Sequence, residues 1–184
     1  MSILSVIIPV FNRTEELRRA LNSLVDQTFK DFEVVVCDDG SDLDVESVVS
    51  PYMKLLNLVF LRIENSGGPA RPRNYAVKHT ISDWVSFLDS DDWWRPERLE
   101  QVIKNIADDV DIIYHPLILK GHQHADLWPL RSRDIQKGKP IQGDPYVYML
   151  SRGNPIANSS VVIRRTIFEQ AGGFCEDPSI VSLE

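Results

Sequence analysis

The sequence predicts an α/β fold in which helices flank a mostly parallel sheet. Three observations lead to this class. Apolar, β-rich runs alternate along the first half of the chain with segments of helical periodicity, which is typical of strand–helix–strand units with right-handed crossovers. The run at 33–37 does not alternate between apolar and polar residues, as expected for a strand buried on both faces. At 184 residues, the chain can bury a core without disulfides or metals.

The strands are expected where the apolar, β-rich runs lie. The first is expected at 3–8, and Pro9 should break it because proline has no N–H to donate to a sheet. The run at 33–37 is the second. Four more are expected, at 58–63, 84–88, 110–114 and 156–163.

The helices are expected where apolar residues recur three and four positions apart. The first follows Thr14, its expected N-cap, and its apolar face is Leu17, Ala20, Leu21, Leu24 and Val25. A later helix should open with Pro96, which suits the first helical position, and should carry Leu99, Val102, Ile103 and Ile106 on one face. The other helices are expected at 45–56, 73–81 and 165–171.

Charge and cysteine content limit the partners. The chain has 20 Lys and Arg residues against 27 Asp and Glu, a net charge of −7, whereas nucleic-acid binding favours a basic stripe. We therefore expect no nucleic-acid partner. Cys37 and Cys175 lie far apart beside apolar residues, so we expect two reduced, mostly buried thiols in a cytosolic protein. The N-terminus lacks the basic start of a signal peptide, which also indicates the cytoplasm.

The segment 115–146 differs from the rest because it is rich in proline and charge and has little periodicity. Long loops of this kind are often substrate lids or binding loops. Its basic residues should form a solvated face; the alternative is a peripheral contact with anionic lipid headgroups at the inner face of the membrane. These residues are Arg131, Arg133, Lys137 and Lys139. His122 and His124 are expected to be a solvated pair rather than metal ligands.

Polar and acidic side chains follow the predicted strands, at the edge where ligands bind in open parallel sheets. The segments at this edge are 9–12, 38–41, 65–68 and 89–92. Two of them carry clustered aspartates with no matching lysine cluster, and clustered carboxylates repel one another unless a cation lies between them. Carboxylate oxygens at this density suit Mg²⁺ or Mn²⁺, with phosphate oxygens completing the shell. The alternative is that Asp38 and Asp39 merely end a strand and cap a turn.

The ordered set of motifs resembles the nucleotide-binding half of family 2 glycosyltransferases. It begins with the segments 5–13 and 31–41 and continues with Gly67-Gly68-Pro69-Ala70, Arg73-Asn74, the segment 87–92 and Gly172-Gly173-Phe174. The resemblance covers nearly the whole chain and is weakest at 115–146. It implies a GT-A fold, Rossmann-like, with a nucleotide-sugar-binding part at 1–114 and an acceptor-side segment of the same domain at 115–184.

The resemblance also implies an activity. Such enzymes transfer a sugar from a nucleotide-sugar donor, here a UDP-sugar, to a hydroxyl of a glycan or lipid-linked acceptor, usually with inversion, in polysaccharide or glycan synthesis. Asp39 is similar to the aspartate that accepts the uracil N–H, Asp38 precedes it, and the base would be bordered by Pro9, Val10 and Phe11. The sequence Asp89-Ser90-Asp91 resembles the DxD motif, in which Asp89 and Asp91 would hold the metal against the diphosphate.

Several neighbouring residues keep two interpretations. Arg73 matches the family's Ala-Arg-Asn segment and would contact a phosphate or form a surface salt bridge, and Arg71 could serve instead. Gly173 resembles the turn residue that lets the backbone approach the donor sugar. Asp92 would assist the metal or cap the next helix. Packing is favoured over sugar stacking for Trp93 and Trp94.

The catalytic base is the main departure from the family pattern. Family members carry it in a Glu-Asp pair after the Gly-Gly-Phe turn, and here the sequence ends with Leu183-Glu184. We therefore expect a segment cut from a longer protein, with its base directly after Glu184. The alternative function is a non-catalytic nucleotide-sugar binding module. The sequence shows neither a P-loop nor a G-x-G-x-x-G fingerprint, nor the glycine-rich basic loop of nucleotidyltransferases.

Overall fold

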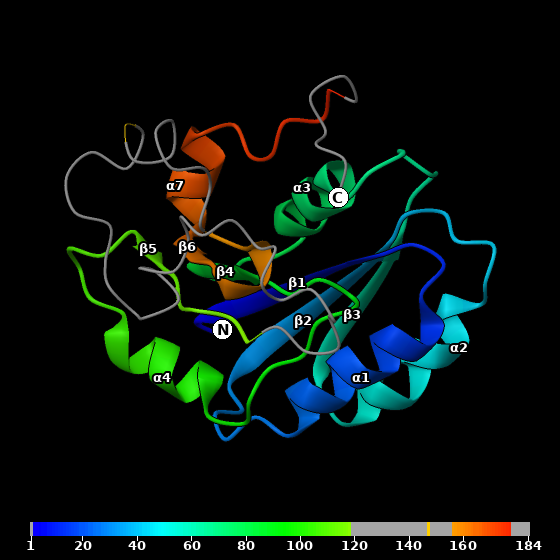
Figure 1. Cartoon of the computed structure of the whole chain (residues 1–184), viewed down its shortest axis with the longest axis horizontal. Coiled ribbons are helices and arrows are strands. Elements are labelled where there is room, and N and C mark those ends of the chain that lie inside the picture. The colour runs from blue at the N-terminus through cyan, green and yellow to red at the C-terminus, as the bar shows by residue number, and fades with distance from the viewer. Residues whose placement is uncertain (1, 119–146, 148–155, 178–184) are drawn as a thin grey trace.

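The computed structural model describes residues 2–118, 147 and 156–177, and it contains one six-stranded sheet among them. The strand order is β3-β2-β1-β4-β6-β5 (Figure 1). The strands are β1 (Leu4–Val10), β2 (Phe32–Asp38), β3 (Asn57–Arg62), β4 (Trp84–Phe87), β5 (Ile112–Ile113) and β6 (Val162–Arg164). The first four run parallel, and β6 is antiparallel to both β4 and β5. The predicted mostly parallel α/β sheet is confirmed.

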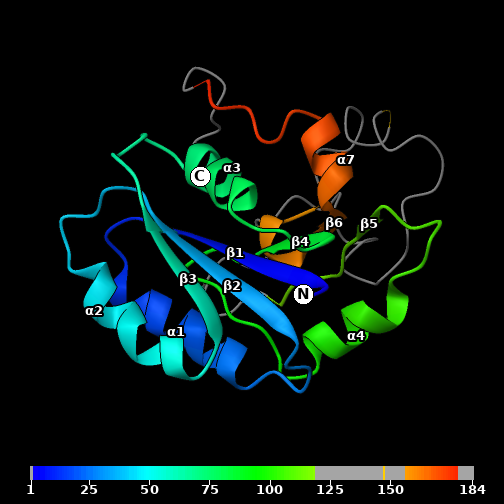
Figure 2. The same ribbon diagram turned by 180° about the vertical axis from the view of Figure 1, so that it is seen from behind.

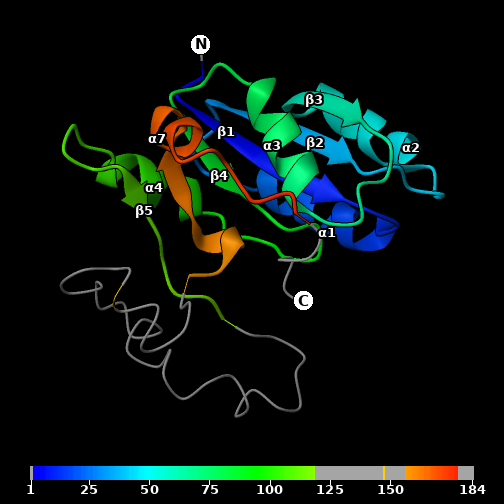
Figure 3. The same cartoon turned by 90° about the horizontal axis from the view of Figure 1, so that it is seen from above.

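Helices cover both faces of this sheet. The helices are α1 (Thr14–Val25), α2 (Val45–Val49), α3 (Ala70–Lys78), α4 (Arg98–Asn105) and α7 (Arg165–Gln170), with 3₁₀ turns at Ser50–Lys54 and Asn158–Ser160. Helices α1, α2 and α4 lie on one face, and α3 and α7 lie on the other (Figures 1 and 2). Figure 3 shows α3 lying across β1 and β2, with α7 beside β4 and β6.

The core consists of two apolar clusters, one on each side of the sheet. Alternate residues of β1 serve different clusters: Val6 and Ile8 pack with Leu21 of α1, whereas Ile7 packs in the cluster that contains Val77 of α3. All seven residues of β1 are buried. This two-sided burial explains why the predicted strands lack an apolar–polar alternation.

Pro9 does not break β1, contrary to the prediction. The strand continues to Val10, and Pro9 pairs with Cys37 in β2. The carbonyl of Ile7 accepts the N–H of Leu88 on the β4 side, and the nitrogen of Pro9, two residues further on, faces the same side. The pairing with β4 ends at Ile7. The missing N–H of Pro9 therefore removes no bond from the sheet.

Other element ends also differ from the prediction. Arg13, not Thr14, is the N-cap of α1, and no side chain caps that helix. Helix α4 begins at Arg98 because Pro96 lies in the preceding turn, where its carbonyl accepts the N–H of Thr28. The strand expected at 156–163 contains a 3₁₀ turn that buries Ser159 and Ser160 before β6 begins.

The two thiols differ in their surroundings. Cys37 is buried in β2, and burial, with Asp39 and Asp38 nearby, raises the pKa of its thiol to about 12. Cys175 is exposed, which contradicts the expectation that both thiols are mostly buried, and both are free. Among the described residues, none of the helices has the length and apolar character needed to cross a bilayer.

Candidate functional site

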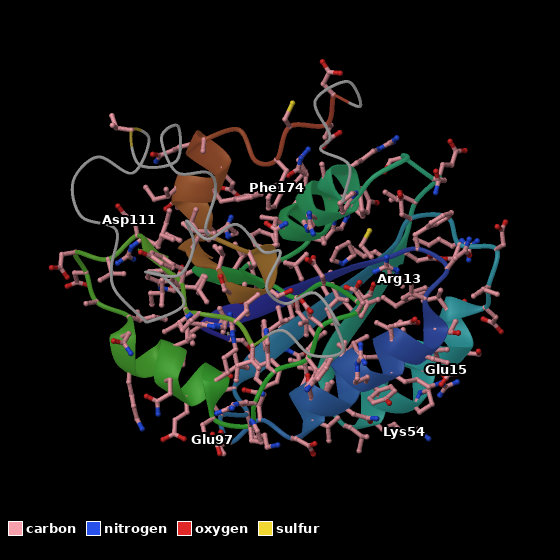
Figure 4. All side chains as sticks on the ribbon, viewed as in Figure 1. Arg13, Glu15, Lys54, Glu97, Asp111 and Phe174 are labelled. Carbon is pink, nitrogen blue, oxygen red and sulfur yellow. The ribbon has the colours of Figure 1, made fainter. Side chains whose placement is uncertain are left out.

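The polar segments expected to converge do so at the carboxyl ends of β2, β1 and β4, which are neighbours in the sheet. Asn12 and Arg13 follow β1, Asp38 ends β2 with Asp39 directly after it, and Asp89 follows β4. Figure 4 labels Arg13, whose side chain lies beyond the end of β1. The parallel order of these strands brings their ends to one edge.

Asp39 lies almost fully buried beneath the loop that follows β3. Its N–H donates to the carbonyl of Val10 at 2.9 Å, and its Oδ1 accepts from the N–H and Oγ of Ser66 at 3.0 and 2.8 Å. Burial raises the pKa of Asp39, although the bonds from Ser66 and the charge of Arg71 act in the opposite direction. Within the described residues, its Oδ2 makes no hydrogen bond, so one acceptor atom is left for a ligand.

Asp38 has a structural role beside it. Its side chain is fully buried, its Oδ1 accepts the N–H of Ser41 at 3.0 Å, and its Oδ2 lies 3.0 Å from Nη1 of Arg62. That approach to Arg62 is an ion pair without an aligned hydrogen bond. These contacts agree with the alternative interpretation of the sequence, in which Asp38 ends the strand and caps the following turn.

Two residues with left-handed backbone shape the loops here. Asn12 has φ 52°, and its Oδ1 accepts the N–H of Asp42 at 2.8 Å, which ties the loop after β1 to the loop after β2. Gly40 has φ 73°, and a Cβ on it would lie 2.6 Å from the backbone nitrogen of Asn65. Glycine at this position lets the loop after β3 approach Asp39.

The acidic triplet after β4 is held by arginines. Asp89 forms an ion pair with Arg73, and its N–H donates to Oγ of Ser159 at 3.0 Å. Asp91 forms an ion pair with Arg13 in which both side chains are about half exposed. Ser90 between them is buried. Arginines from other segments therefore offset the repulsion among the carboxylates. The sequence predicted no such partners, because it has no lysine cluster near the triplet and the arginines lie far away along the chain.

The donor set suits a divalent ion only in part. Among the described residues, no three carboxylate, imidazole or thiol groups gather as a metal site would require. Asp89 is tied to a buried arginine, whereas Asp91 pairs with a half-exposed one that could move away. Of the two carboxylates, that of Asp91 is therefore the less constrained among the described residues.

The three residues after the triplet differ in burial: Trp94 is buried, Asp92 is half-buried and Trp93 is exposed. Asp92 is half-buried, and burial raises its pKa against the effect of a hydrogen bond with Ser159. Trp94 is buried and donates its indole N–H to the carbonyl of Ser159 at 2.9 Å, as a packing residue should. Trp93 is exposed, with the guanidinium of Arg19 4.1 Å from its ring centroid.

Of the two arginines considered for a phosphate contact, Arg73 is not a surface residue. Its side chain is 4% exposed and is held by Asp89, with its guanidinium 5.2 Å from the ring centroid of Phe174. Arg71 is exposed and close enough to Asp39 to lower the pKa of that carboxyl. Arg73 therefore forms a salt bridge, as one of the two alternatives expected, but a buried one rather than one at the surface. Arg71 is the more exposed of the two arginines.

The predicted turn at Gly172-Gly173-Phe174 is present, and both glycines have positive φ. The side-chain amide of Asn74 in α3 holds this turn. Its Oδ1 accepts the N–H of Phe174 at 2.9 Å, and its Nδ2 donates to the carbonyl of Phe174 at 2.9 Å and to Oε1 of Glu176 at 2.8 Å. The glycine at 173 is required by this contact with Asn74.

Of the three residues expected to border a base, only Phe11 presents an exposed side chain, because Pro9 and Val10 are buried in β1. The contacts of Ser66, Arg62 and Ser159 were missed from the sequence, since a serine or arginine in a loop carries no signal of its partner. The basic residues Arg131, Arg133, Lys137 and Lys139, the histidines His122 and His124, and Glu184 lie outside the described residues.

The mostly parallel sheet, with acidic groups at the ends of adjacent strands, has the architecture of a GT-A-type α/β fold. The profile of the family described as Glycosyl transferase family 2 matches residues 5–170. The chain belongs to this family.

Curated relatives and solved structures agree with this assignment. An uncharacterized glycosyltransferase of Haemophilus influenzae is 37% identical over 115 residues, 61% of this chain and 38% of that protein. The poly(ribitol-phosphate) beta-N-acetylglucosaminyltransferase TarS of Staphylococcus aureus is 43% identical over 99 residues, 52% of this chain and 17% of that protein. The chain thus spans well under half the length of these relatives.

The crystal structure of S. aureus TarS 1-349 in complex with UDP superposes with a TM-score of 0.75 and 27% identity, over 98% of this chain and 52% of that chain. Its complex with UDP-GlcNAc gives a TM-score of 0.70 at 28% identity, over 94% and 48%. A mannosyltransferase of Pyrobaculum calidifontis, in complex with GDP-Man and Mn²⁺, shares the fold with a TM-score of 0.69 at 23% identity, over 95% and 48%.

Proposed function

We propose that the chain is the donor-binding part of a glycosyltransferase that uses a UDP-sugar. The sugar would pass, with inversion, to a hydroxyl of a glycan or lipid-linked acceptor in polysaccharide or glycan synthesis. Residues 1–114 would bind the nucleotide-sugar, and 115–184 would form the acceptor side of the same domain. Relatives crystallised with UDP and UDP-GlcNAc support this donor class.

The arrangement around Asp39 carries the proposal. Ser66 occupies Oδ1 with two hydrogen bonds and so fixes the carboxylate, while Oδ2 keeps its acceptor capacity. Uracil presents an imide N–H, which needs an acceptor of this kind. Phe11 is exposed at the end of β1 and supplies an apolar surface for the base, with Pro9 and Val10 beneath it. Asp38 would support Asp39 through the turn at Ser41.

The diphosphate would lie between the triplet and the loop after β3. Asp91 would hold Mn²⁺ or Mg²⁺ against it, and Asp89 would face the ribose and the metal while Arg73 fixes its orientation. The bound cation would offset the negative charge that develops on the leaving nucleoside diphosphate. Arg71 would contact a phosphate, and the backbone at Gly173 would face the donor sugar.

The remaining parts rest on the family resemblance. The resemblance places the catalytic base in a Glu-Asp pair after the turn at Gly172-Gly173-Phe174. Two free cysteines favour a cytosolic location, with a peripheral contact to the inner face of the membrane if the acceptor is lipid-linked. The alternative function is a non-catalytic nucleotide-sugar binding module. Such a module would bind the donor but would transfer no sugar to an acceptor.

Calorimetric titration with UDP and GDP, each with Mn²⁺ and with EDTA, tests the donor site. UDP should bind in preference to GDP. Asp39→Ala should weaken UDP binding with and without metal, and Asp91→Asn should weaken it only with Mn²⁺. The control is Asp31→Ala, which removes an exposed carboxylate before β2 at the opposite edge of the sheet. Equal UDP affinities for wild type and Asp39→Ala would remove Asp39 from the base site.

A further inference from the structure

A cavity of about 870 Å³ lies beside the acidic triplet; it shares Asp91 with the proposed donor site, and the rest of its wall is formed by residues that the donor site does not use. It extends from Asp91 and Asp92 along α4 to the segment 113–118 that follows β5. Figure 4 labels two residues that locate these elements: Glu97 at the start of α4 and Asp111 before β5. The cavity is both next to the triplet and wide enough for a sugar-sized ligand.

The guanidinium of Arg98 forms part of this cavity wall. Arg98 is 8% exposed, and its charge lies 3.5 Å from the ring centroid of Trp94, which also lines the cavity. Its Nε donates to Nε2 of His115 at 3.0 Å, and its Nη2 donates to Oγ of Ser86 at 2.9 Å. Its Nη1 is buried and has no hydrogen-bond partner within the described residues.

Among the residues that the structure describes, none of the hydrogen-bond partners of Arg98 carries a negative charge. His115 accepts at Nε2, so it is neutral, with the proton on Nδ1 where it donates to the carbonyl of Pro116 at 3.0 Å. Burial and the charge of Arg98 lower the pKa of His115, which keeps the ring neutral. Burial also lowers the pKa of Arg98 to about 9, with no nearby acid among the causes. A buried cation with free N–H groups is costly unless an anion meets it.

We propose that this cavity binds an oxyanion, the phosphate or carboxylate of the acceptor substrate, against the guanidinium of Arg98. A guanidinium with unpartnered N–H groups donates strong, charge-assisted hydrogen bonds to a phosphate or carboxylate oxygen. The other cations on the wall, Arg19 and Arg95, and its acids, Asp91, Asp92 and Glu97, are half-buried or exposed. The role in acceptor binding rests on the proposed function, whereas the anion site itself does not.

Binding of two probes tests this site: glycerol 3-phosphate for a phosphate and glucuronate for a carboxylate. Each is titrated by calorimetry in EDTA, and again with UDP and Mn²⁺ present so that the donor site is filled. The wild type should bind at least one probe in both conditions, and the probe that binds identifies the group. Loss of the charged hydrogen bonds in Arg98→Gln should weaken binding about ten- to a hundredfold.

A second variant avoids the risk that Arg98→Gln fails to fold. Gln101 is exposed on α4, lines the same cavity and lies one turn from Arg98, so Gln101→Glu supplies a competing carboxylate. It should weaken probe binding to a similar degree. Its matched control is Gln170→Glu, the same charge change at an exposed position in α7 outside the cavity wall, which should bind as wild type does.

Two results would overturn the proposal. The first is no binding of either probe to the wild type, which would mean that the chain itself neutralises Arg98. The second is equal binding by Gln101→Glu and Gln170→Glu. The UDP titration in the same samples separates the two proposals, because loss of UDP binding would reject the donor site without affecting the probe result in EDTA.

Discussion

A Cβ atom on Gly173 would lie 2.6 Å from the side-chain Oδ1 of Asn74, closer than any real contact allows. The same Oδ1 accepts the N–H of Phe174, so it is not free to move aside. The turn after α7 is thus held against α3 by the side-chain amide of Asn74, and the close approach is possible because Gly173 has no Cβ. Because this turn leads toward the position where the resemblance places the base, its geometry matters for the proposed site.

Replacing Gly173 with alanine should therefore destabilise the chain more than the same change at Gly172. Both residues have positive φ, but a Cβ at 172 would meet nothing within 4 Å. We expect Gly172→Ala to lower the free energy of unfolding by about 1–2 kcal/mol, the cost of left-handed backbone. Gly173→Ala should cost at least about 1 kcal/mol more, from the clash. Denaturant unfolding of the two variants measures the difference.

A double-mutant cycle identifies the source of that difference. Adding Asn74→Ala removes the atom that the new Cβ would strike, so the excess cost of Gly173→Ala over Gly172→Ala should shrink in that background. An unchanged excess would place the strain elsewhere, for instance against Phe168, whose ring also lies near this position.

Asp39→Asn should raise thermal stability at neutral pH. Burial raises the pKa of Asp39 in the folded state above its unfolded value, so its favourable contribution is complete below the unfolded pKa and is lost as pH rises through the folded pKa. Asparagine keeps an Oδ1 that can accept both bonds from Ser66 without burying a charge. The gain in unfolding midpoint should be present at pH 7 and shrink as the pH falls through the folded pKa.

The control for this titration is Asp31→Asn, the same change at an exposed position. It should track the wild type across the pH series. A stability gain for Asp39→Asn that persists unchanged at low pH would show that the buried charge is not its cause. Weaker UDP binding together with higher stability would identify Asp39 as a residue kept for binding at a cost in stability.

The two thiols should react very differently. With a pKa of about 12, Cys37 exists as thiolate in about one molecule in ten thousand at pH 8, and it is buried. Cys175 is exposed. A thiol-reactive chromophore should therefore modify one equivalent in the native protein and two in denaturant. Cys175→Ser should abolish the native reaction, and a fast second equivalent in the native state would contradict the buried position of Cys37.

Local patterns predicted the parallel part of the fold because β1 and β2 are largely apolar runs without alternation, as expected for strands buried on both faces. The antiparallel direction of β6 was not predictable from local patterns. It depends on long-range pairing with β4 and β5, which no local pattern in the sequence encodes. In the site, the aspartates were found because they follow strands directly. Their arginine partners were not, because Arg13 and Asp91 are 78 positions apart and no local signal joins them.

The ion pair between Arg13 and Asp91 predicts competition with a metal. If Asp91 is the cation ligand, Arg13 must leave it before the ion binds, and an exposed pair of this kind contributes up to about 1 kcal/mol. Arg13→Gln should therefore tighten binding of Mn²⁺ alone by up to about fivefold, as measured by the electron paramagnetic resonance signal of free Mn²⁺.

Arg18→Gln is the control, because Arg18 lies in α1, close to Arg13 in the sequence, and pairs with Glu15 instead. Adding Asp91→Asn to Arg13→Gln should abolish the gain. Weaker Mn²⁺ binding by Arg13→Gln, or a gain that survives Asp91→Asn, would place the ion away from Asp91.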